Sequence, residues 1–240
     1  MIKRIKEVIK ENKEWQKKII AQNEELLWAN IFHDSIRGKK AIEDLPLNIG
    51  RWAGNYSFFY VLNRILNDYQ PKRILEFGLG ESSKFVSVYL DNYLINSEHL
   101  IIEQDDNWRI TFENKFVLSL RSFIKVLPLI KKKYKECDFN GYENIENTIT
   151  SAFDLYLIDG PFGSSNYSRF DIFTLVQKLS NKDEFIILID DYDRHGEKQT
   201  VNELLKMFKN KEMNVFTATY TGMKGVIVIG TEKYKYITSL

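Results

Sequence analysis

The segment RILEFGLGESSK, residues 73–84, most constrains what this chain can fold into. Its apolar start predicts a buried strand over residues 73–77, and Gly78 and Gly80 predict a tight turn directly after that strand. A helix is expected to follow over residues 82–94. A turn of this kind lets a ligand approach the backbone, and it directs free helix N–H groups at that ligand. The segment therefore predicts an α/β fold with a ligand-binding turn.

The rest of the chain alternates between apolar strand patterns and helical patterns. Continuous apolar strands separated by helices favour a largely parallel sheet covered on both faces. The last two expected strands are joined by only a short Tyr-Thr-Gly-Met-Lys turn, which is too short for a crossover and predicts an antiparallel pair. Strands are expected at 73–77, 99–103, 123–127, 153–158, 185–189, 214–219 and 225–229, and helices at 56–69, 82–94, 106–119, 142–150, 168–179 and 198–210.

Four motifs resemble those of class I S-adenosylmethionine-dependent methyltransferases. They are EFGLGESSK at 76–84, IEQDDNW at 102–108, LIDGPFG at 157–163 and IDDYDRHGE at 189–197. The similarity is greatest to a bacterial subgroup found in surface-polysaccharide gene clusters, and it extends distantly to the glucuronoxylan O-methyltransferases. The resemblance implies a three-layer αβα Rossmann-like fold whose seven-stranded, mostly parallel sheet carries an antiparallel C-terminal hairpin strand. It also implies S-adenosylmethionine as cofactor.

Candidate cofactor-binding residues follow the first two expected strands. Ser82 or Ser83 can cap the helix after the turn. Glu103 ends the second strand 25 positions after Gly78, close to the spacing at which an acid binds both ribose hydroxyls in nucleotide-binding α/β folds. A solvated acid at a strand end is the alternative for Glu103. The expected cofactor-binding residues are Glu76, Gly78, Gly80, Ser82, Ser83, Glu103 and Gln104.

Three aspartates are the candidate catalytic residues. Asp159, Asp190 and Asp191 follow two apolar strands, and ligands of open parallel sheets lie outside the carboxyl ends of the strands. Adjacent carboxylates must bind a cation, share a proton or accept strong donors. Oxygen ligands suit Mg²⁺ or Mn²⁺, as in the catechol-type O-methyltransferases, but the asparagine of that pattern is missing here, so metal dependence stays open. His195 could act as a base, or could be an exposed loop histidine.

Residues 2 to about 33 predict one long helix, so we expect a helical extension over 1–49 before a methyltransferase domain over 50–240. Its heptad positions include Asn12, Gln16 and Asn23, which is unfavourable for a long coiled coil. The helix could pack on the domain as an amphipathic element, or it could form a homodimer.

Bulk composition excludes several classes of protein. The net charge of +1 gives no overall sign of nucleic-acid binding, and a single cysteine, Cys137, excludes an intramolecular disulfide. No apolar run approaches the ~20 residues that span a bilayer, and a charge-rich start does not resemble a secretory signal. We therefore expect a cytoplasmic protein without a membrane span.

The motifs together predict a methyltransferase acting on a hydroxyl of a sugar or another small acceptor. One alternative is an NAD(P)-dependent oxidoreductase that uses the same glycine turn, although a serine replaces the last glycine of the dinucleotide fingerprint. Another is a non-catalytic module that keeps the sheet and works through its N-terminal helix.

Overall fold

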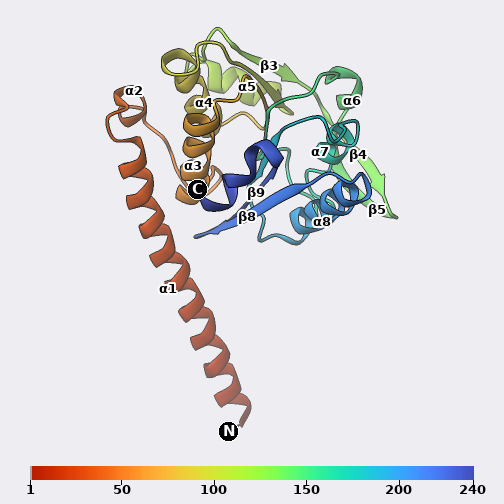
Figure 1. Ribbon diagram of the computed structural model, residues 1–240. Coiled ribbons are helices and arrows are strands. Elements are labelled where there is room, and N and C mark those ends of the chain that lie inside the picture. Colours follow the sequence, from red (N-terminus) through yellow and green to blue (C-terminus); the bar gives the residue numbers. More distant parts are fainter. Residues whose placement is uncertain (1) are drawn as a thin grey trace.

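A seven-stranded sheet with the order β3-β2-β1-β6-β7-β9-β8 organises the molecule (Figure 1). The computed structural model describes residues 2–240. Five strands are parallel, while β9 pairs antiparallel with both β7 and β8, as the short turn predicted. The strands are β1 Arg73–Phe77, β2 Glu98–Glu103, β3 Ser122–Val126, β6 Leu155–Ile158, β7 Ile186–Ile189, β8 Val215–Thr221 and β9 Gly225–Thr231.

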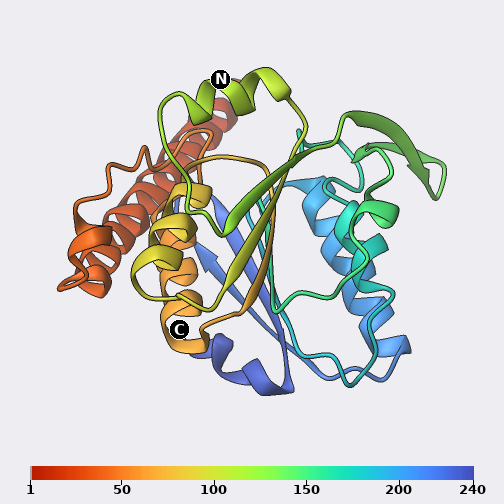
Figure 2. The same ribbon diagram turned by 90° about the horizontal axis from the view of Figure 1, so that it is seen from above.

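Helices cover both faces of the sheet, which gives the predicted three-layer arrangement (Figure 2). Alternate strand residues serve alternate faces: Ile74 packs with the cluster that includes α3 and α4, and Leu75 with the cluster that includes α7 and α8. Among the described residues, no helix is long and apolar enough to cross a membrane. The helices are α1 Ile2–Ile36, α2 Lys40–Glu43, α3 Tyr56–Arg64, α4 Glu81–Asn92, α5 Asp106–Glu113, α6 Ile145–Thr148, α7 Asp171–Val176 and α8 His195–Asn210, with a π-helical turn at Ile65–Tyr69 and 3-10 turns at Glu232–Ser239.

The expected long N-terminal helix is present as α1, and only its C-terminal part contacts the rest of the protein (Figure 1). Phe32 and Ile36 are buried in the same core cluster as α3 and α4. Every described side chain from Lys3 to Ile20 is exposed. The division of the chain into an extension over 1–49 and a domain over 50–240 stays a prediction, and the end of α1 belongs to the domain core.

Several helix boundaries differ from the sequence prediction. The helix after the glycine turn begins at Glu81, with Gly80 as its N-cap, so Ser82 and Ser83 lie in its first turn instead of capping it. The expected helix over 106–119 ends at Glu113. The expected helix over 142–150 shrinks to four residues because Tyr142 belongs to a strand and Asn144 is left-handed, with φ of 52°.

An antiparallel hairpin formed by β4 Leu129–Tyr134 and β5 Cys137–Tyr142 was missed by the sequence analysis. Lysines at three consecutive positions hid the strand pattern, and the run around Lys131 was interpreted as a solvated face. The turn residues Lys135 and Glu136 both have positive φ, of 44° and 63°. Such a turn is usually built from Asn and Gly, so neither residue type signalled a hairpin.

Glu203 of α8 links this hairpin to the sheet, which predicts a pH-dependent contribution to stability. Its carboxylate accepts from Tyr134 at 2.9 Å and from Lys135 at 2.7 Å. Hydrogen bonding to Lys135 first, then to Lys206 and Tyr134, lowers the pKa of Glu203 from 4.5 to about 2. A lowered pKa gives stability that is present above pH 4.5 and is lost as the pH falls toward 2.

We therefore expect Glu203→Gln to lower the free energy of unfolding by about 1–2 kcal/mol at pH 7, because the partner lysines are partly solvated. Urea unfolding at pH 7, 4 and 3 measures the difference from wild type, which should shrink as the pH falls. Glu212→Gln, at the exposed residue after α8, controls for the loss of a surface charge. A pH-independent difference would contradict this account.

Candidate active site

The candidate site lies at the carboxyl edge of the parallel strands. β1 is flanked by β2 on one side and β6 on the other, and the strand order reverses between β1 and β6. Ligands of open α/β sheets bind at such a switch point. The residues that follow β2, β1, β6 and β7 therefore meet there, in the order Glu103, Gly78, Asp159 and Asp190.

The glycine turn is held close to the end of β6. Gly78 has a φ of +94°, a conformation that favours glycine. A Cβ on Gly160 would lie 2.8 Å from both N and Cα of Gly78, so neither glycine leaves room for a side chain. A Cβ on Gly80, in contrast, would meet nothing within 4 Å. The open side of the turn is therefore at Gly80, where a ligand can approach the backbone.

Glu76 and Ser82 hold the turn in place from below. Glu76 is fully buried, and its carboxylate accepts a short hydrogen bond from the Ser82 hydroxyl. Nε2 of the buried His99 lies 2.9 Å from the other Glu76 oxygen. Ser83 accepts a hydrogen bond of 3.0 Å from the Gly80 N–H. In this arrangement both serine hydroxyls contact protein groups and fix the first turn of α4.

Glu103 faces the glycine turn and is 4% exposed. One carboxylate oxygen accepts from the Leu79 N–H at 2.8 Å, and the other accepts from the N–H groups of Gln104 and Asp105 at 2.7 and 2.9 Å. Trp108 donates its indole N–H to the Leu79 carbonyl at 2.7 Å. The end of β2 and the glycine turn thus form one hydrogen-bonded unit, and the tryptophan is part of it.

Gln104 connects the β2 end to the loop after β6, because its side-chain carbonyl accepts from the Phe162 N–H at 3.0 Å. Phe162 itself is 66% exposed. The predicted cofactor-binding residues therefore surround one stretch of the sheet edge, although Glu76 and Ser82 contact each other instead of open space.

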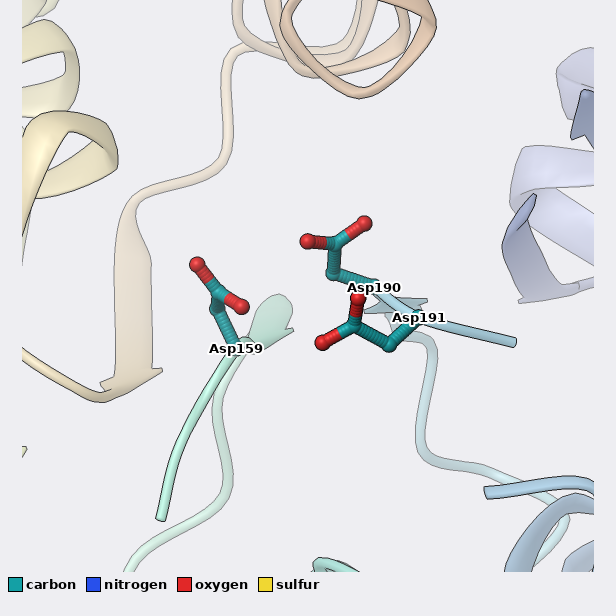
Figure 3. Close-up of side chains that lie close together, drawn as sticks. All are labelled: Asp159, Asp190 and Asp191. Carbon is teal, nitrogen blue, oxygen red and sulfur yellow. The ribbon is translucent and has the colours of Figure 1, made fainter. Parts of the chain in front are cut away.

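The three aspartates come together as a cluster (Figure 3). Asp159, Asp190 and Asp191 each place a carboxylate oxygen within 4.8 Å of the others. Burial, and then repulsion from Asp190, raises the pKa of Asp159 well above its usual range. Burial also raises the pKa of Asp190, while Lys224 opposes the rise. The edge therefore holds carboxyl groups that retain protons more readily than surface acids do.

Two cationic side chains neutralise this cluster. Arg169 is 4% exposed and donates to Asp191 Oδ2 at 2.8 Å and to the Asp190 carbonyl at 2.9 Å. Lys224 Nζ lies 3.4 Å from carboxylate oxygens of both Asp190 and Asp191. Lys224 also donates to the Ala53 carbonyl at 2.9 Å, so the loop before α3 is tied to the same site.

His195 and Arg194 lie at the start of α8. His195 is exposed, and in the described part of the chain no hydrogen bond or ion pair joins it to the aspartates. Arg194, with a half-exposed side chain, pairs with Asp191 at 2.9 Å. The exposed guanidinium is therefore the one positive group of this pair of residues that meets solvent beside the cluster.

Lys224 and Gly160 are the site residues that sequence reasoning missed. Gly160 lies within the quoted LIDGPFG motif, but the close approach to Gly78 needs the strand pairing to be known. Lys224 had no signal beyond its position in the turn between the last two strands. Its place at the cluster depends on β9 being inserted beside β7.

The donor set fits a divalent cation in part. All three candidate ligands are carboxylates, the type that Mg²⁺ and Mn²⁺ prefer. Asp190 Oδ1 is buried without a hydrogen-bond partner, as expected of an oxygen that awaits a cation. Lys224 and Arg169 already supply positive charge to the other oxygens, however, so a metal ion would have to share the cluster with them.

Solved structures share this architecture. A protein assigned as an O-methyltransferase from Klebsiella pneumoniae matches with a TM-score of 0.50 at 16% identity, over 85% of this chain and 89% of that one. The O-methyltransferase TomG from Streptomyces achromogenes, in complex with S-adenosylmethionine, also matches with a TM-score of 0.50, at 14% identity, over 83% and 87% of the two chains. The chain has the methyltransferase fold.

This result confirms the fold predicted from the sequence motifs. No protein-family model matches the sequence, and no curated protein is similar to it. At identities this low the likeness concerns the fold alone, so the chemistry has to be inferred from the residues at the sheet edge.

Proposed function

We propose that this protein is an S-adenosylmethionine-dependent O-methyltransferase. The observation that carries the proposal is the carboxylate cluster of Asp159, Asp190 and Asp191 beside a glycine turn and Glu103, all at the switch point of a methyltransferase fold. Glu103 would bind the ribose hydroxyls, and the open backbone at Gly80 would receive the methionine part of the cofactor. The aspartates would then face the methyl group.

In the proposed reaction, an acceptor hydroxyl oxygen forms a bond to the methyl carbon while the bond from that carbon to sulfur breaks. The products are a methyl ether and S-adenosylhomocysteine, and the hydroxyl proton must pass to a base. We assign this role to Asp159, because its raised pKa suits proton transfer and its side chain is 17% exposed, the most of the three. Alignment of acceptor and methyl group supplies much of the remaining rate.

The acceptor proposed here is a sugar or another small hydroxyl compound. The sugar is supported by the motif resemblance, and the half-exposed Arg194 could bind an acidic group on such an acceptor. A divalent metal held by the three aspartates would lower the pKa of the acceptor hydroxyl. His195 is a secondary candidate for the base, since it is exposed near the cluster without a contact to it.

An NAD(P)-dependent oxidoreductase is the competing function. Ser83 occupies the place of the last fingerprint glycine, and its hydroxyl bonds to the Gly80 N–H. The antiparallel β9 also differs from the parallel crossovers of a dinucleotide-binding half. Both features favour the methyltransferase.

Thermal unfolding with S-adenosylhomocysteine tests the proposal, with NAD as the competing ligand and with Mg²⁺ present or absent. At 100 times its dissociation constant the ligand should stabilise the wild type by about 2.7 kcal/mol. We expect this stabilisation to disappear in Glu103→Ala and to be reduced in Glu103→Gln, which keeps one acceptor oxygen for the turn. Glu113→Ala, on the exposed side of α5, should respond as the wild type does.

Stabilisation by NAD alone would overturn the methyltransferase proposal. Stabilisation by S-adenosylhomocysteine that persists in Glu103→Ala would show that this acid does not hold the cofactor. A larger shift with Mg²⁺, lost in Asp190→Asn, would support the metal.

A further inference from the structure

Helix α1 carries an apolar surface that the rest of the chain leaves uncovered. Eight aliphatic or aromatic side chains between Ile5 and Leu27 are each 50–65% exposed, and we call them the apolar stripe. Members such as Ile5, Ile9, Ile19 and Leu26 recur at helical spacing, so they share one side of the helix. Continuous exposed apolar surface of this kind indicates an interaction site.

The opposite side of α1 is the one that packs on the domain. Glu25 accepts hydrogen bonds from Asn55 and from the N–H groups of Tyr56 and Met223, all at 2.8–2.9 Å. Trp28 and Phe32 follow at helical spacing and pack against the core. At 3.6 residues per turn these residues point roughly 160° away from the apolar stripe. The domain therefore cannot cover the stripe, even beside Leu26 and Leu27.

We propose that the apolar stripe is the contact surface for α1 of a second copy of this chain, making the protein a homodimer. Asn12, Gln16 and Asn23 lie in the middle of the stripe. Amides buried between two helices can bond to the matching amides of the other copy, and such residues fix register in paired helices. A lipid surface offers these groups no comparable partner.

The size of the stripe agrees with a dimer interface. Burying a Leu or Ile side chain fully is worth ~1.5–3 kcal/mol at ~25 cal/mol/Å², which corresponds to ~60–120 Å² each. Eight half-exposed side chains then offer roughly 400 Å² of apolar surface per chain. Since interfaces are about 57% apolar, two copies would bury roughly 1,400 Å² in total, within the range of specific dimers.

The competing occupant is an anionic membrane surface. Seven Lys or Arg against three Glu lie between Lys3 and Lys18, a composition also found in helices that lie on membranes. The amides at the centre of the stripe favour the second copy, and the experiment separates the two.

Sedimentation velocity of the full-length protein over a range of concentrations tests the proposal. We expect a species of twice the chain mass of 28.4 kDa for the wild type. Ile9→Glu combined with Ile19→Glu should weaken dimerisation by about 100-fold or more, because charges would enter the contact. Lys10→Gln combined with Lys17→Gln makes the same net charge change on the opposite side and should stay dimeric.

Both double variants change exposed positions, so their thermal unfolding should match that of each other's monomer fold, and S-adenosylhomocysteine binding provides an independent check of the domain. A wild type that stays monomeric, or a stripe variant as dimeric as its control, would overturn the proposal. So would a monomeric wild type that cosediments with phosphatidylserine vesicles through the stripe. None of these outcomes depends on the reaction that the domain catalyses.

Discussion

Replacing Arg169 with methionine is expected to lower the free energy of unfolding by about 3–5 kcal/mol. The guanidinium is buried and bonds to the Asp191 carboxylate and the Asp190 carbonyl, and it lies 3.5 Å from Asp159. Removing it leaves several carboxylates together in a buried place with Lys224 as their remaining close cation from outside α8. Urea denaturation at pH 7 measures the loss.

Arg194→Met is the matched control for Arg169→Met. Arg194 pairs with the same Asp191, but its side chain is 52% exposed, so we expect a change within about 1 kcal/mol. Arg169→Lys should fall between the two, because it keeps the charge and loses the two-pronged bonding. Equal losses for Arg169→Met and Arg194→Met would show that burial of the pair is not what matters.

Replacing Gly160 with alanine is expected to destabilise the protein by about 3 kcal/mol. The new Cβ would lie 2.8 Å from backbone atoms of Gly78 and 3.0 Å from the Phe77 carbonyl carbon, and backbone cannot move aside as a flexible side chain can. The ends of β1 and β6 would have to separate, which also displaces the glycine turn.

Gly80→Ala, in the same turn, is the control for Gly160→Ala. The Gly80 backbone is extended, with φ of −169°, and its Cβ would meet nothing within 4 Å, so we expect a stability change within about 1 kcal/mol. Thermal and urea unfolding of the two variants give the comparison. If Gly160→Ala were as stable as Gly80→Ala, the close approach of the two glycines would not constrain the fold.

The main features of the fold were predictable because strand burial leaves a strong pattern. Residues such as Leu155 and Ile186 belong to continuous apolar runs, and the length of the last connection sets the direction of β9. The hairpin β4–β5 was not predictable, since its lysines alternate between partners such as Asp171 and solvent, and alternation of that kind is invisible in residue type.

The site was predictable where strand ends define it. Asp159 and Asp190 follow strands that pair directly, so their meeting required only the sheet rule. Lys224 could not be predicted, because a turn residue gains its place from tertiary packing alone. The roles of Glu76 and Ser82 illustrate the same limit, since only the structure shows that their side chains contact each other.

The antiparallel direction of β9 has a consequence for how proteins of this design can diverge. Because β9 starts where β7 ends, the turn that carries Lys224 is delivered to the aspartates, and the Tyr192 N–H bonds to the Gly225 carbonyl at 2.7 Å. The elements around Glu103 lie two strands away, across β1. A changed hairpin tip could thus retune the acceptor side while the cofactor side is inherited intact, much as a tool handle accepts different heads.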